Sequence, residues 1–246
     1  MTFHIDRRIV VLAVACAAVA AGCVAVYALT GRWIYLFFVW NLFLAVLPVV
    51  VSVVVDRVGR VRPWVGWVGC AVWLPLFPNT VYVATDVVHL VRVPFFATYR
   101  GSCTDEGWPF HCYAGDASAW AQLVVMMGLV VVTLWLGLWS LGHVHAFLAD
   151  RWGPVGGWSA VVAVAVATGY GVYLGRFVRL NSWEVLNPGV LVPRALDATN
   201  RFAAVFTAMF AVYVLVAYLL AWAFADRSPV RLGRVDRPAG DAPGRG

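Results

Sequence analysis

Long apolar runs constrain the fold of this chain more than any other feature of its sequence. A helix needs about 20 apolar residues to cross the ~30 Å hydrocarbon core of a bilayer, and six runs reach that length. No period-two alternation of the kind found in membrane β-barrels runs through them. The sequence therefore predicts an all-α, polytopic membrane protein with six transmembrane helices, at Ile9–Leu29, Trp33–Val55, Trp64–Ala84, Ala117–Leu141, Val155–Leu174 and Phe202–Ala225.

Charge content places the chain in the same class. Only 12% of its 246 residues are charged and 63% are hydrophobic, whereas a soluble domain carries about 25% charged residues. The formal net charge is +6, and all 18 basic residues are Arg. The sequence carries no basic patch interleaved with aromatic residues and no nucleic-acid-binding motif. The lipid bilayer, with its anionic head groups, is therefore the expected partner, and nucleic acid is not.

Arginine positions in the flanking segments predict the orientation in the membrane. If the N-terminus lies inside, the inner segments carry 11 Arg and the outer segments carry 7. Four of those 7 lie in one segment between the last two runs, which we expect to be partly embedded. Because cytoplasmic flanks are enriched in Arg, we expect both termini on the cytoplasmic side of the membrane.

The first run has a second interpretation. Arg7-Arg8 followed by Ala and Val resembles a signal peptide, and Cys23 follows small residues as in a lipoprotein cleavage site. However, the bulky aliphatic residue expected three places before Cys23 is missing, and the run continues to Leu29. The pattern favours a retained helix, and the rest of the topology is the same in either case.

The chain divides into two parts by composition. Residues 1–225 hold the six-helix transmembrane domain, and residues 226–246 form an Arg-, Pro- and Gly-rich tail that we expect to be disordered in the cytoplasm. The two halves of the domain share no repeated motif, so the inverted-repeat pattern of many transporters finds no support.

A polar stripe ends the third run. Four polar residues follow one another at spacings of three, four and three, which places them on one face of a helix: Asn79, Tyr82, Asp86 and His89. Pro75 and Pro78 precede this stripe, and a proline within a helix removes a hydrogen bond and bends or breaks it. In the expected orientation the stripe lies at the extracytoplasmic end.

A second polar cluster closes the fifth run. Gly171 and Gly175 are four residues apart, a spacing that lets another helix approach closely, and Arg176 and Arg179 follow on one expected face. Asn181 and Glu184, which flank Trp183, form a potential capping box. This pattern predicts a short extracytoplasmic interfacial helix, ended by Pro188-Gly189.

The second run adds Asn41, which lies about two turns inside its outer end. The second, third and fifth runs therefore all place polar residues on the same side of the membrane. An ion pair between Asp86 and an Arg would relieve the cost of an isolated charge near lipid. The candidate ligand-binding residues are Asn41, Asn79, Tyr82, Asp86, His89, Arg176, Arg179, Asn181, Trp183 and Glu184.

The cluster admits three functions. It can lock helices together, as intramembrane polar residues often do. Paired guanidinium groups also suit a phosphate or carboxylate, so it can bind or transport a small anion, an anionic head group or a lipid-linked ligand. Finally, Asp86 and His89 are candidate catalytic residues for acid–base chemistry. No nucleophile motif or cofactor motif accompanies them, and no metal or cofactor is expected.

Cys103 and Cys112 lie in a polar loop on the expected outer side. Eight residues separate them, so a disulfide is plausible in an oxidising compartment. His111 beside Cys112 leaves a metal pair as the alternative, although two ligands fall short of the usual three or four.

Three phrases of this sequence resemble a known family, the bacterial membrane proteins of domain of unknown function 1361. The phrases are Asn41–Pro48, Pro78–Leu90 and Tyr173–Glu184, and they occur in the family's order and with similar separations. Departures are Val81 for a frequent Pro, Leu180 for a frequent Trp and Glu184 for a frequent Asp. The two-Cys loop is particular to this chain. The resemblance implies a multi-spanning protein of a bacterial cell membrane and supplies no activity.

Overall fold

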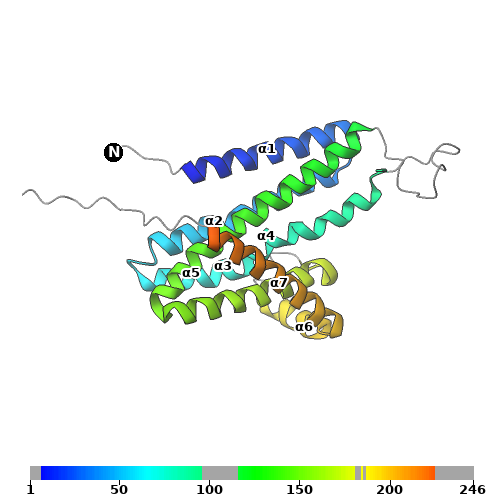
Figure 1. Ribbon diagram of the computed structural model, residues 1–246. Coiled ribbons are helices and arrows are strands. Elements are labelled where there is room, and N and C mark those ends of the chain that lie inside the picture. The colour runs from blue at the N-terminus through cyan, green and yellow to red at the C-terminus, as the bar shows by residue number, and fades with distance from the viewer. Residues whose placement is uncertain (1–6, 96–115, 181–183, 185–186, 225–246) are drawn as a thin grey trace, which may run out of the picture.

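The computed structural model describes residues 7–95, 116–180, 184 and 187–224 (Figure 1). These residues form helices and short connections, and no strand occurs among them. In chain order the elements are α1 (Arg7–Thr30), α2 (Ile34–Arg57), α3 (Pro63–Leu76), α4 (Pro78–Tyr82), the 3₁₀-helix η1 (Val83–Arg92), α5 (Ala117–Tyr173), the π-helix η2 (Leu174–Val178), α6 (Pro188–Ala198) and α7 (Arg201–Phe224).

Five helical stretches of the described chain are long and apolar enough to cross a membrane. They cover Ile9–Thr30, Ile34–Arg57, Pro63–Arg92, Ala117–Val178 and Arg201–Phe224. The all-helical membrane class predicted from the sequence is therefore confirmed. The difference lies in the fourth and fifth predicted spans, which fall within one continuous stretch that contains α5.

Gly153 interrupts α5. Its backbone has φ 75° and ψ 174°, a conformation that glycine adopts readily and other residues rarely do. Pro154 follows and has no N–H to donate to the preceding turn. Figure 1 shows α5 as two helical segments that run in opposite directions, and the interruption between them falls at Gly153.

Of the two prolines of the third span, only Pro78 lies at a boundary between elements, whereas Pro75 lies inside α3 and does not interrupt it. Helix α3 ends at Leu76 and α4 begins at Pro78. The axis continues, however, because Phe77 keeps helical angles and its N–H donates to the Trp73 carbonyl at 2.9 Å. From Val83 the chain winds as a 3₁₀-helix to Arg92, eight residues beyond the predicted end of the span at Ala84.

Helix α5 is the centre of the packing, because α1, α2, α4 and α7 all contact it. One apolar cluster joins α3, α4, α5 and α7 around Trp73, Phe77 and Phe147. A second joins α1, α2, η1 and α5 around Phe38 and Met126. Together they fix the position of η1 between α2 and α5.

Helix α6 was not predicted. The short helix expected from Asn181 to Pro188-Gly189 lies mostly outside the described residues, and α6 begins at Pro188 and continues to Ala198. Proline is favoured in the first turn of a helix, where its missing N–H has no partner to lose. Tyr170 and Tyr173 of α5 fasten α6, since their hydroxyls donate to the carbonyls of Ala195 and Ala198 at 2.6 and 2.9 Å.

Candidate functional site

Asp86 is the centre of a buried polar cluster. Its side chain is only 1% exposed, yet both carboxylate oxygens have a donor. The Asn41 amide donates to Oδ2 at 2.8 Å, and the Arg176 guanidinium donates to Oδ1 at 2.5 Å. Three elements that are distant in sequence, α2, η1 and η2, therefore meet at one carboxylate, and the Asp–Arg pair expected from the sequence is present.

Thr85 holds the same guanidinium from a second direction. Its hydroxyl accepts from Arg176 Nε at 2.9 Å and from Nη2 at 2.5 Å, and it donates to the Tyr82 carbonyl at 2.6 Å. The Arg176 guanidinium carbon also lies 4.7 Å from the centre of the Tyr82 ring, within the range of a cation–π contact. Sequence reasoning missed Thr85, although its place beside Asp86 was a usable signal.

His89 lies beside this cluster, at ion-pair distance from Asp86 but without a hydrogen bond to it. Its Nε2 is 3.8 Å from Asp86 Oδ1, which is beyond hydrogen-bond distance. The side chain is 38% exposed, and its ring centre is 6.0 Å from that of Phe38. Asp86 is buried with both oxygens engaged, whereas His89 is partly exposed beside it.

A cavity of about 480 Å³ adjoins the cluster, within the usual size range of small-molecule sites. Its polar lining comes from the candidate residues Asn41, Asn79, Tyr82, Arg176 and Arg179, and its apolar lining includes Phe37, Trp40, Leu44, Leu180 and Leu191. Asp86 and His89 are not among the lining residues. The cavity therefore presents two guanidinium groups and a mostly apolar wall.

Two glycines, Gly171 of α5 and Gly175 of η2, allow α4 to approach closely, as their four-residue spacing predicted. A Cβ at Gly171 would lie 2.8 Å from Pro78 Cγ, and one at Gly175 would lie 3.1 Å from the Tyr82 ring. Both distances are shorter than ordinary van der Waals contacts. Without side chains at these positions, α4 can lie against the end of α5, where Tyr82 reaches Arg176.

Arg179 has an unusual backbone conformation. It ends η2 with φ 58° and ψ 39°, in the left-handed region that few residues other than Gly, Asn and Asp enter. Arg176 and Arg179 were predicted to share one face of a regular helix. The π-helical turn and the left-handed residue replace that regular helix, yet both side chains line the cavity. Among the described residues, only Arg176 of the two forms an ion pair.

The remaining candidates lie elsewhere or outside the described residues. Asn79 lines the cavity and its amide donates to the Leu76 carbonyl at 3.0 Å. Glu184 accepts from Arg194 at 3.0 Å and is not a lining residue. Asn181 and Trp183 lie outside the described residues, as do Cys103 and Cys112 and the predicted tail at 226–246.

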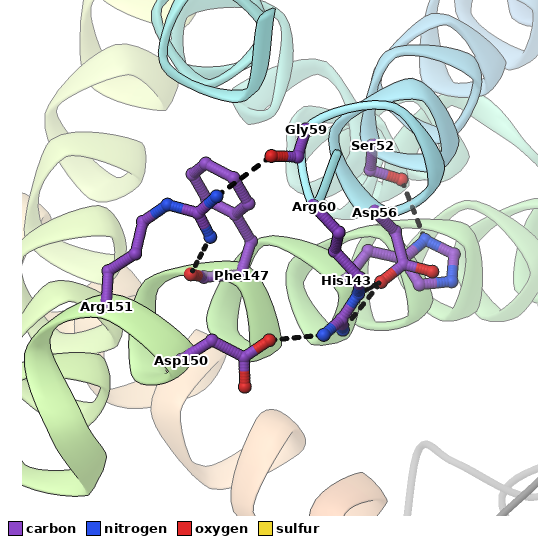
Figure 2. A network of polar contacts seen from close by, with 8 residues as sticks. All are labelled: Ser52, Asp56, Gly59, Arg60, His143, Phe147, Asp150 and Arg151. Atoms are coloured by element: carbon purple, nitrogen blue, oxygen red, sulfur yellow. Dashed lines mark hydrogen bonds and ion pairs between the residues drawn. The ribbon is translucent and has the colours of Figure 1, made fainter. Parts of the chain in front are cut away.

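A second polar network lies at the opposite ends of α2 and of the first segment of α5 (Figure 2). Arg60 pairs with Asp56 at 2.8 Å and also with Asp150. The hydrogen bond to Asp56 raises the pKa of Arg60 above its usual value. This network was not predicted, although the four-residue spacing of Asp56 and Arg60 suits an ion pair on a helix.

Arg151 completes that network. Its guanidinium donates to the carbonyls of Gly59 at 2.8 Å and Phe147 at 3.1 Å, and it lies 3.6 Å from the centre of the Phe147 ring. Nearby, the Ser52 hydroxyl and His143 Nδ1 are 3.1 Å apart. These contacts, drawn in Figure 2, fasten the turn after α2 to α5.

Metal binding has no geometric support in the described part of the chain, where no group of three His, Cys, Asp or Glu side chains comes together. His143 and His145, two residues apart, have different partners. The His145 Nδ1 lies 2.7 Å from the Tyr218 hydroxyl of α7, and the ring stacks edge-on against Trp158.

Comparison with known proteins gives the chain a family. A family model described as a protein of unknown function (DUF1361) matches residues 40–217. No curated protein and no solved structure matches the chain. The matched region includes Asn41, Asp86, Arg176 and Arg179, and it covers more than half of the sequence. The chain therefore belongs to the DUF1361 family.

Proposed function

We propose that the cavity between α2, α4 and η2 binds an anionic group such as a phosphate or carboxylate. The observation that carries this proposal is that only one of the two guanidinium groups lining the cavity is in an ion pair with a described residue. Arg176 is paired with Asp86 at 2.5 Å, so that pair adds no net charge. Arg179 lines the same cavity and forms no ion pair with a described residue, which leaves one net positive charge for a ligand.

The contacts of Arg176 also suit a binding site. Asp86 and Thr85 occupy Nε and Nη2, and no described residue bonds to Nη1. An anion can therefore contact Arg176 without displacing Asp86. Hydrogen bonds between ionised partners are roughly twice as strong as neutral ones. In this account the buried cluster both joins three elements and orients Arg176 toward the cavity.

The backbone of Arg179 gives independent support. A non-glycine residue in the left-handed region costs about 1–2 kcal/mol, and Gly or Asn would fit position 179 at less cost. Strained residues are enriched at binding and active sites, where the side chain is needed despite the strain. Arg at this position is therefore better explained by a ligand than by stability.

The proposed topology places the cavity at the outer face of a bacterial cell membrane. The 57 residues of α5 rise about 85 Å at 1.5 Å per residue, more than twice the ~30 Å hydrocarbon core. With Gly153 at a turn, α5 crosses twice and the chain crosses six times, so both termini lie on one side, which the Arg distribution makes the cytoplasmic side. Helix α6 then lies at the outer interface.

Cysteine labelling tests this topology. Val155 and Trp33 are 81% and 72% exposed, next to Gly153 and at the turn before α2. In a background whose five native cysteines are replaced by Ser, Val155→Cys should react with a membrane-impermeant maleimide only from the cytoplasmic side, and Trp33→Cys only from outside. Labelling of both from one side would contradict six crossings.

Anion binding is tested with detergent-purified protein. Phosphatidic acid and glycerol phosphate should each raise the melting temperature of the wild type, and phosphatidylcholine should not. Arg179→Gly should abolish both shifts. The matched control is Arg194→Gln, which removes an exposed Arg that pairs with Glu184 and does not line the cavity.

The stability of Arg179→Gly separates binding from folding. Because glycine relieves the left-handed strain, the unliganded variant should be as stable as the wild type, or more stable by about 1 kcal/mol. Equal ligand shifts in the wild type and in Arg179→Gly would contradict the proposal.

A further inference from the structure

We infer that the anion bound in this cavity is the head group of a membrane amphiphile, whose hydrocarbon chain leaves the cavity past Phe37 and Trp40. This inference rests on the proposed function and adds the class of ligand. It comes from the part of the cavity lining that belongs to α2. Besides Asn41, whose amide is bonded to Asp86, α2 presents Phe37, Trp40 and Leu44, which offer a free phosphate no polar partner.

The exposure of the aromatic wall shows that the cavity is open on one side. Phe37 and Trp40 line the cavity, yet they remain 50% and 49% exposed. They therefore form its rim, with one side toward the cavity and the other toward the surroundings. On a membrane-spanning helix those surroundings are lipid, so the cavity is continuous with the hydrocarbon of the bilayer.

The spacing of the rim residues suits an extended chain. Phe37, Trp40 and Leu44 follow one another at intervals of three and four, which places them in one stripe along α2. From Phe37 to Leu44 the helix rises about 10 Å. The stripe begins near the Ile34 end of α2, so it continues from the outer end of the helix toward the membrane interior.

The charge of the Arg176 and Arg179 side of the cavity, and its position at the membrane boundary, both suit an acidic head group. Arg176 and Arg179 lie where the second segment of α5 ends, which is the membrane boundary in the proposed topology. Lipid phosphates lie at that boundary, and arginines there attract anionic lipids. A head group held by these residues leaves its chain beside Trp40.

Fluorescence quenching in nanodiscs tests this inference. The full-length protein is placed in phosphatidylcholine nanodiscs that contain a small fraction of brominated-chain phosphatidic acid or, separately, brominated-chain phosphatidylcholine. Bromine quenches tryptophan at short range, so the acidic lipid should quench the wild type more. Trp40→Phe should lose this excess. Trp135→Phe should keep it, since Trp135 is an equally exposed tryptophan (54%) outside the cavity.

A second variant keeps the test decisive should Trp40→Phe fold poorly. Leu44→Trp adds a tryptophan on the same stripe, and it should increase the excess quenching by the acidic lipid. No excess in the wild type, or an excess that persists in Trp40→Phe, would overturn the inference.

The melting shift with glycerol phosphate separates the two proposals. If glycerol phosphate stabilises the wild type but not Arg179→Gly while no excess quenching occurs, the site binds a soluble anion. The inference of an amphiphilic ligand is then wrong, and the proposed binding of an anion stands. If neither glycerol phosphate nor the acidic lipid acts through Arg179, both proposals fail.

Discussion

Two polar clusters in this protein use the same residue types with different consequences. Around Asp86, an Asp–Arg pair is buried, with the carboxylate 1% and the guanidinium 19% exposed. Around Arg60, the side chains of the two pairs are 32–51% exposed. Both clusters connect the ends of helices, but only the first adjoins a cavity that two arginines line. The two clusters therefore differ in burial rather than in residue types: the Asp86 cluster is a buried candidate site, and the Arg60 cluster is a set of exposed ion pairs that connect helix ends.

The difference also has an energetic side. Ion pairs exposed to water contribute about 0–1 kcal/mol, because solvent screens them and ordering the side chains costs entropy. A buried pair adds little net stability when complete, but removal of one partner leaves an uncompensated charge. The following variants use this asymmetry and are ordered by the size of the expected effect.

The largest effect is expected for Arg176→Leu. It leaves the Asp86 carboxylate buried with only the Asn41 amide as a partner, and loss of one partner of a buried pair costs about 3–5 kcal/mol. Denaturant unfolding in detergent measures this change. The control is the double variant Asp86→Asn/Arg176→Leu, which removes both charges and should recover most of the loss. Equal losses in the single and double variants would mean that Asp86 is not effectively buried.

Thr85→Val should have the next largest effect. Valine fills the same volume but cannot accept the two hydrogen bonds from Arg176, and bonds to a charged group contribute about 1.5–3 kcal/mol. Unfolding measures the loss, and the melting shift with phosphatidic acid should shrink because Arg176 is less well oriented. A full shift would show that Thr85 does not position Arg176.

Gly137→Ala tests the packing that places α4 beside α5. A Cβ at position 137 would lie 2.4 Å from Thr80 Oγ1, and overpacking of this kind costs about 1–3 kcal/mol. Gly142→Ala on the same helix is the matched control, since nothing lies within 4 Å of its Cβ. Because alanine favours a helix by up to about 1 kcal/mol, the control should be neutral or stabilising. Equal changes in stability for Gly137→Ala and Gly142→Ala would show that the close contact between Gly137 and Thr80 is not important for packing.

Arg60→Gln should have the smallest effect, about 0–1 kcal/mol, because both of its pairs are exposed. The loss should decrease further at high salt, which screens exposed charges. Unfolding at low and high salt measures both effects, and phosphatidic acid should bind as it does to the wild type. A loss as large as that of Arg176→Leu would erase the distinction between the two clusters.

Much of the fold followed from the sequence because the membrane limits the possible structures. Apolar length predicted the helices, and Pro78 marks the division between α3 and α4, while Pro75 lies inside α3. Glycine spacing predicted the close approach at Gly171 and Gly175. A pair between Asp86 and an Arg followed from the cost of an isolated charge near lipid, although the sequence did not indicate that the Arg is Arg176. Each of these inferences depends on composition or spacing along one segment.

The details that the sequence did not predict depend on local winding and on tertiary contacts. A regular helix was assumed where the chain adopts a 3₁₀-helix at Asp86 and a π-helical turn at Arg176. Neither the left-handed Arg179 nor the start of α6 at Pro188 follows from a periodic pattern. Thr85 became visible only once η2 was placed beside η1. The ligand-binding role of these residues stays a prediction.

Native mass spectrometry of three proteins tests the central claim most directly. Wild type, Arg179→Gly and Arg60→Gln are purified in parallel with phosphatidic acid and phosphatidylcholine in equal amounts. We predict that the wild type and Arg60→Gln retain a bound phosphatidic acid and that Arg179→Gly does not. Equal retention by all three proteins, or a loss confined to Arg60→Gln, would contradict the assignment of the cavity as an anion site.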